Sequence, residues 1–119
     1  MPDVKRERCE LIAESLAAIN DYMQNIHSAN DFIHLRQGRL YLDAITLRLQ
    51  VIGENVKQIE TVYPGFFAAA LGYNIDDIIR FRDFVSHHYE RLDYQIIYDT
   101  CVSDLSLFAE KISRFLNEK

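Results

Sequence analysis

The sequence predicts an all-α fold, an up-and-down bundle of four main helices with short helical turns between them. The 119 residues are enough for one hydrophobic core, so we expect residues 1–119 to form one domain. Only four Gly and two Pro interrupt the chain, which is too few for the many turns of an all-β domain. Apolar residues also recur at steps of three and four, the period of a helix face. Helices are therefore expected throughout.

The first half of the chain contains two long apolar-periodic segments. The first predicts a helix over residues 4–26, and the second predicts a helix over residues 39–61 that Pro64 and its neighbours end. Between them, residues 28–31 supply helix-capping side chains, and residues 32–35 are expected to form a short helical turn. The first stripe consists of Leu11, Ile12, Leu16, Ile19, Met23 and Ile26, and the second of Leu40, Ala44, Ile45, Leu47, Val51, Ile52, Val56 and Ile59.

The second half predicts two more helices. After a short apolar turn at residues 66–71, a third helix is expected to begin near Asn74 or Asp76, whose side chains can cap it. It should end at about Ser86, because residues 86–89 have only middling helix propensity. Asp93 is the expected N-cap of the last helix, whose apolar stripe runs from Ile96 to Leu116.

Charge and cysteine usage limit the possible functions. The net charge of -5 disfavours a protein that binds nucleic acid along a broad basic face. The charged N-terminus contains no signal-peptide core, and no apolar run approaches the length of a membrane span, so we expect a cytoplasmic protein with no membrane partner. Cys9 and Cys101 lack the spacing of a metal or redox motif and are interpreted as core thiols without a function.

A local group of cationic residue types falls within a span of twelve residues at the end of the predicted third helix and just after it. On charge alone, a solvated helix face is the favoured explanation of this group. Two of its members, Arg82 and His87, are the types needed to cleave RNA without a metal. His can move a proton from the 2′-OH, and Arg can stabilise charge on the phosphoryl oxygens. Glu54, on the second long helix, is expected to face this segment and pair with Arg82. The whole group consists of Arg80, Arg82, His87, His88 and Arg91.

Helix geometry restricts how Arg82 and His87 can act together. Five residues apart on a regular helix, the two positions lie about 140° apart around the axis. Either the helix ends near Ser86, so that His87 turns towards Arg82, or a second copy of the chain completes the site in a shared cleft. We expect both.

The run Arg82-Asp83-Phe84-Val85-Ser86-His87-His88-Tyr89 has the pattern R-x-x-x-x-H-x-Y, which resembles the signature of the HepT-like HEPN ribonucleases. These are the toxins of HEPN/MNT toxin–antitoxin pairs. The chain also resembles this family in length, in helical order and in a G-E-x-x-K segment, here Gly53 to Lys57. The position after the Arg is often Asn in the family, whereas this chain has Asp83, which adds a negative charge close to the expected RNA phosphate.

The resemblance implies an all-α HEPN-like fold and a metal-independent endoribonuclease toxin of a type VII-like pair. Arg82 and His87 would be catalytic, with Asp83, Glu54 and His88 in support, and His88 is either a bystander or a substrate contact. No metal or other cofactor is expected. The substrate would be RNA, with tRNA as a candidate, rather than DNA, and the toxin would act as a homodimer with a composite cleft.

The resemblance also implies a regulatory partner, a minimal nucleotidyltransferase antitoxin that transfers AMP from ATP to Tyr89. The bulk and negative charge of the attached nucleotide would block the site. The alternative interpretation of Tyr89 is an amphipathic ring that packs on the bundle.

Two other function classes stay open. The chain could be a non-catalytic HEPN module that binds a nucleotidyltransferase or a nucleotide, or a helical bundle without a site. RNA incubated with the pure protein and a chelator distinguishes the first alternative from a ribonuclease.

Overall fold

The computed structural model describes residues 3–88 and 93–118, with side chains described as far as Asp83 and again from Asp93. Its long helices are α1 (Val4–Met23), α3 (Gly38–Val62), α4 (Asp76–His88) and α6 (Leu105–Asn117). The shorter elements are α2 (Asp31–His34), the π-helix η1 (Phe67–Leu71), α5 (Tyr94–Asp99) and the π-helix η3 (Thr100–Asp104). The described ranges contain no strand, so the predicted all-α class is confirmed.

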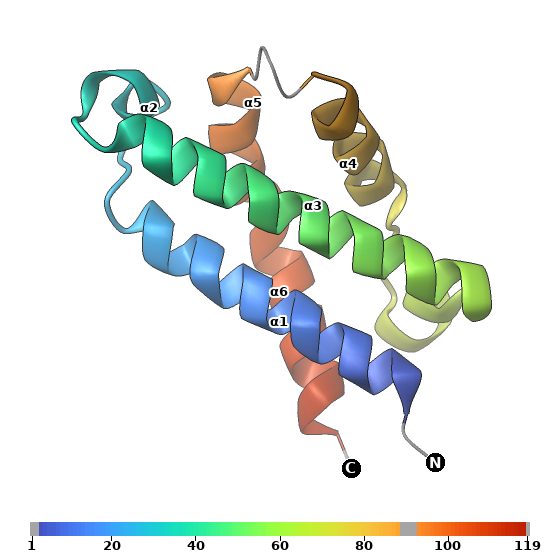
Figure 1. Ribbon diagram of the computed structural model, residues 1–119. Coiled ribbons are helices and arrows are strands. Elements are labelled where there is room, and N and C mark those ends of the chain that lie inside the picture. Colours follow the sequence, from blue (N-terminus) through green and yellow to red (C-terminus); the bar gives the residue numbers. More distant parts are fainter. Residues whose placement is uncertain (1–2, 89–92, 119) are drawn as a thin grey trace.

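The helices alternate in direction, as expected for an up-and-down bundle (Figure 1). α1 and α3 lie side by side and antiparallel, and α6 crosses behind them. α4 packs on α3, and α5, η3 and α6 follow one another as one long, locally widened helix. No helix in the described ranges is long and apolar enough to span a membrane.

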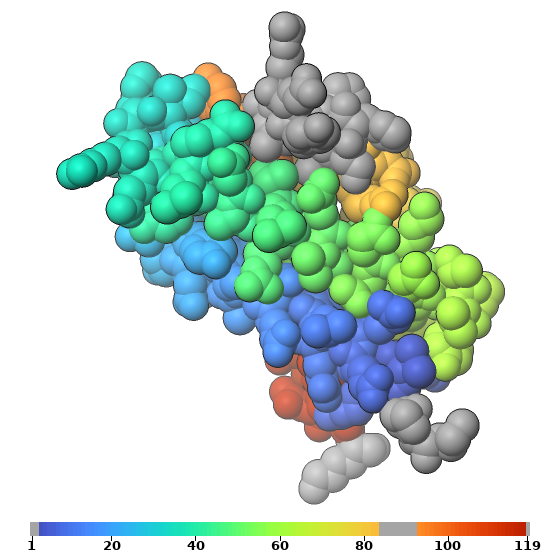
Figure 2. Space-filling model, viewed as in Figure 1, coloured from blue at the N-terminus to red at the C-terminus, as the bar shows by residue number. Residues whose placement is uncertain are grey.

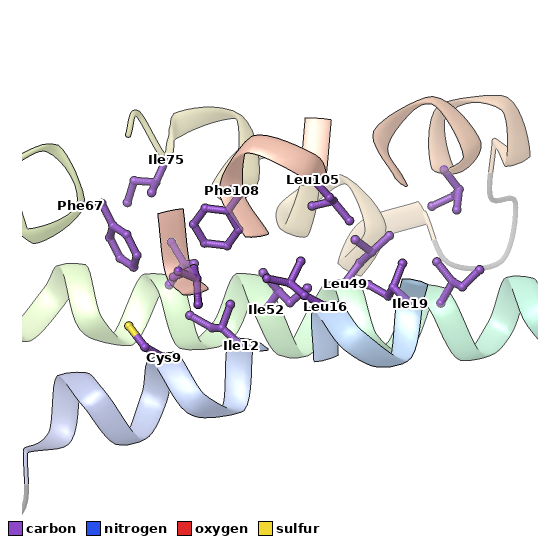
Figure 3. Close-up of a cluster of buried hydrophobic side chains, with 14 of the residues drawn as sticks. Cys9, Ile12, Leu16, Ile19, Leu49, Ile52, Phe67, Ile75, Leu105 and Phe108 are labelled. Carbon is purple, nitrogen blue, oxygen red and sulfur yellow. The ribbon is translucent and has the colours of Figure 1, made fainter. Parts of the chain in front are cut away.

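The core lies where the helix stripes meet, between α1, α3 and α6 (Figure 3). Phe67, Phe108 and Ile12 are completely buried there, and the rings of Phe67 and Phe108 lie 6.2 Å apart between centroids. Burial of each such side chain contributes about 1.5–3 kcal/mol of hydrophobic free energy. The π-helix η1 therefore places Phe67 in the centre of the core and holds the α3–α4 connection against α6.

The predicted helix beginnings are confirmed at their caps. The Asp93 side chain accepts hydrogen bonds from the backbone N–H groups of Gln95 and Ile96, and Asn74 accepts one from Asp76. The Asp3 side chain caps α1 in the same way, by accepting from the Arg6 N–H.

The predicted end of the third helix at Ser86 is wrong, because α4 continues through Ser86 and His87 to His88. Ser and His each cost only a few tenths of a kcal/mol relative to Ala in a helix, and no Gly or Pro interrupts this stretch. Residues of middling helix propensity therefore permit a helix to end but do not force it to end.

Candidate active site

The candidate site is built where α4 crosses the middle of α3. Arg82 reaches this crossing from α4, and its side chain is 22% exposed. Gly53 lies directly beneath it on α3. A Cβ atom at Gly53 would collide with Cβ and Cγ of Arg82, so only glycine permits this approach of the two helices.

Glu54 holds the Arg82 guanidinium from the α3 side. Nη2 of Arg82 forms an ion pair with Oε1 of Glu54, and Nη1 donates a 2.8 Å hydrogen bond to Oδ1 of Asp83. The ion pair with Glu54 is the contact expected from the sequence. Two carboxylates therefore fix the plane of the guanidinium, while Nε of Arg82 is buried and has no acceptor among the described residues.

The segment around Glu54 directs neighbouring side chains to different surfaces. Gly53 faces Arg82 and Glu54 pairs with it, whereas Asn55 is buried against α1. Oδ1 of Asn55 accepts a 3.0 Å hydrogen bond from Nη1 of Arg8, and its amide donates to the Val51 carbonyl at 2.9 Å. The bond from Arg8 ties α3 to α1 at this position, and the bond to Val51 orients the Asn55 side chain within α3.

The other expected residues of the motif lie partly or wholly outside the described part of the chain. His87 and His88 lie in the last turn of α4, but their side chains are outside the described part of the chain. Tyr89 and Arg91 lie outside the described residues altogether. Because the backbone of α4 is helical from Asp76 to His88, positions 82 and 87 lie about 140° apart around its axis, and the helix does not end between them.

The two cysteines agree with their interpretation as core thiols. Cys9 is completely buried and Cys101 is partly buried, and both are free. Burial raises the pKa of the Cys9 thiol to about 11 and that of the Cys101 thiol to about 12. Since the thiolate is the reactive form, burial makes both thiols poor nucleophiles. No group of three or more potential ligand side chains gathers within the described ranges.

One determinant of the site was missed in the sequence. In the sequence, Gly53 stands out only as the first residue of the G-E-x-x-K segment, although it is the residue that lets Arg82 approach α3. A signal existed, because a Gly inside a helix as long as α3 costs about 1 kcal/mol relative to Ala and usually has a packing reason.

The described structure is thus an all-α bundle in which Arg82, the first residue of an R-x-x-x-x-H segment, is held against α3. The family described as "Ribonuclease HepT-like" matches residues 12–115. The chain belongs to this family, and this membership suggests ribonuclease activity. No curated protein and no solved structure matches the chain significantly.

The ion pair between Glu54 and Arg82 should be measurable in a double-mutant cycle. We expect the two side chains to couple by about 0.5–1 kcal/mol in the free energy of unfolding, because they are in contact but partly exposed. Urea unfolding of Glu54→Ala, Arg82→Ala and the double variant gives this coupling, and 1 M salt should reduce it. Additive effects of the two substitutions would show that the pair does not contribute to the stability of the folded protein.

Proposed function

We propose that this protein is a metal-independent endoribonuclease toxin of a toxin–antitoxin pair. The observation that carries the proposal is the fixed guanidinium of Arg82, five residues before His87 on one continuous helix in a chain of this family. Arg82 would stabilise the charge that develops on the phosphoryl oxygens during cleavage. His87 would act as general base on the ribose 2′-OH.

The reaction needs no nucleophile from outside the substrate. The 2′-oxygen loses its proton to His87 and attacks the adjacent phosphorus, and the bond from phosphorus to the 5′-oxygen breaks. The leaving 5′-oxygen takes up a proton from water, protonated His87 returns its proton to the solvent, and the other fragment keeps a 2′,3′-cyclic phosphate. DNA lacks the 2′-OH and is therefore not a substrate of this mechanism.

A dimer would bring together the Arg and the His that diverge on one helix. An apolar stripe on α3 supports this, because Leu40 is 66% exposed and Leu47 is 59% exposed. Ala44 and Val51 continue the stripe at helical spacing, and it leads to Glu54 beside Arg82. Figure 2 shows α3 lying across the face of the molecule in view. A two-fold axis at the stripe would place the Arg82 of one copy near the motif of the other.

Leu47→Glu is expected to convert the dimer to a monomer and to reduce RNA cleavage with it, because two like charges would meet across the axis. Analytical ultracentrifugation and a cleavage assay on the same samples measure both effects. Val102→Glu is the control, since Val102 is 50% exposed but lies in η3, away from the stripe. A Leu47→Glu protein that stays dimeric would exclude the stripe as the interface.

We also propose that a nucleotidyltransferase antitoxin silences the protein by attaching AMP to Tyr89. The phenol lies two positions after His87 in the motif, so a nucleotide there would bring negative charge to the place that the RNA phosphate must occupy.

Tyr89→Phe is expected to keep its ribonuclease activity and to lose its sensitivity to the antitoxin. The test is co-expression with a nucleotidyltransferase encoded beside the gene, followed by mass spectrometry for a gain of one AMP and by a growth assay. If the Phe variant is still silenced and still modified, the nucleotide is attached elsewhere.

Purified protein incubated with RNA and a chelator tests the central proposal. We expect cleaved RNA with 2′,3′-cyclic phosphate ends and an intact DNA oligonucleotide of the same sequence. Intact RNA would favour the alternative, a non-catalytic module that binds a nucleotidyltransferase or a nucleotide. The local excess of carboxylates around Arg82 is the observation that favours this alternative.

A further inference from the structure

A groove separate from the Arg82 site lies between α3, α4 and the widened segment of η3 and α6. Its volume is about 310 Å³, which is in the range of small-molecule sites. Leu49 and Ile52 of α3 and Phe81 of α4 form part of its apolar wall. Asp77 of α4 and Asp104 of η3 also line the groove, and both lie at exposed positions, so their carboxylates belong to its rim. The groove therefore combines apolar contact area with negative charge.

The π-helix η3 shapes one side of this groove. The Leu105 N–H donates to the Thr100 carbonyl, which is the five-residue step of a π-helix, and both residues line the groove. The widened turn also brings Ser103 and Asp104 to it. Short π-helical segments are rare and often occur at functional sites, because the wider turn redirects side chains.

Among the described residues that line the groove, no Lys, Arg or His offsets the charge of the two carboxylates. Arg80 approaches Asp77 at 3.4 Å, but both side chains are largely exposed and such a pair contributes little. Burial, Asp104 and Asp77 together raise the pKa of the Tyr73 phenol, which lines the same groove, so both carboxylates act on this space.

We propose that this groove binds an organic monocation with an apolar body, an alkyl or aryl amine. Its apolar part would lie against Leu49, Ile52 and Phe81, and its ammonium group would lie close to Asp77 and Asp104. A nucleotide fits poorly, because its phosphate would meet two carboxylates. The proposal does not depend on ribonuclease activity.

Titration of the ¹⁵N-labelled protein with hexylamine, hexanol and hexanoate tests the proposal, because the three probes share a chain and differ in charge. We expect hexylamine to shift the amide signals of Tyr73, Asp77 and residues 100–105. Hexanol should bind about tenfold more weakly, and hexanoate should not bind. Asp104→Asn should weaken hexylamine binding about tenfold, whereas Asp99→Asn, an equal change of charge on the exposed side of α5, should not.

A lysine derivative blocked at both ends distinguishes the source of the cation. If it binds as well as hexylamine, the groove accepts a lysine side chain of a partner protein, and if only hexylamine binds, it accepts a free amine. The proposal is overturned if hexanoate binds as well as hexylamine, if Asp104→Asn leaves binding unchanged, if no probe shifts these signals, or if adenosine monophosphate occupies the groove instead.

Discussion

Arg82→Ala and His87→Ala are each expected to slow RNA cleavage by a factor of about 10²–10⁴ and to abolish growth arrest on expression. Removal of a general base typically costs this much, and loss of a group that stabilises transition-state charge costs a similar factor. Initial cleavage rates with a labelled RNA measure the effect. His34→Ala is the control, because it removes the same residue type at an exposed position of α2, outside the motif.

The same two variants also test the shared cleft. If each site takes Arg82 from one copy and His87 from the other, a mixture of the two inactive proteins forms some dimers with one intact site. Random exchange should then restore about a quarter of the wild-type activity, because half of the dimers are mixed and each has one working site. Without any recovery, Arg82 and His87 of the same copy would have to act together. If both single variants cleave at the wild-type rate, the catalytic assignment is wrong.

The fold was predictable from the sequence because its helices are both periodic and capped. The apolar period of residues 39–61 predicts a helix and Asp93 predicts an N-cap, and the structure has both. Not every member of that apolar set is in the core, because Leu40 and Leu47 are exposed.

The end of α4 was not predictable, since residues 86–88 have neither a strong former nor a breaker. The widening at η3 was also missed, although Ile97, Cys101 and Leu105 stand four residues apart, a spacing that a wider turn accommodates.

The site was predictable in part. A carboxylate on the second long helix was expected to meet Arg82, and the ion pair with Glu54 is present. The close approach of α3 and α4 at this contact was not predictable. The apolar period of a helix tells which face packs, but it does not tell how closely two helices approach. Gly53 determines this approach, and its effect on stability should be large enough to measure.

Gly53→Ala is expected to lower the free energy of unfolding by about 1–3 kcal/mol, the usual cost of inserting a methyl group into a filled space. A decrease in the free energy of unfolding would itself indicate the collision, because in an isolated helix Ala is about 1 kcal/mol more favourable than Gly. Here the added Cβ meets Cβ and Cγ of Arg82 and must push α4 away from α3. Urea unfolding followed by circular dichroism measures the loss, with the exposed position Gln58→Ala on the same helix as control.

RNA cleavage should fall in the same Gly53→Ala protein while it is still folded, because displacement of Arg82 breaks its contact with Glu54. A second substitution separates this collision from a general loss of stability. Arg82→Gly removes the atoms that collide, so it should be far less destabilising in the Gly53→Ala protein than in the wild type. If Gly53→Ala instead stabilised the protein, α3 and α4 would not be in contact at this position, and Arg82 would have to be held by Asp83 and α4 alone.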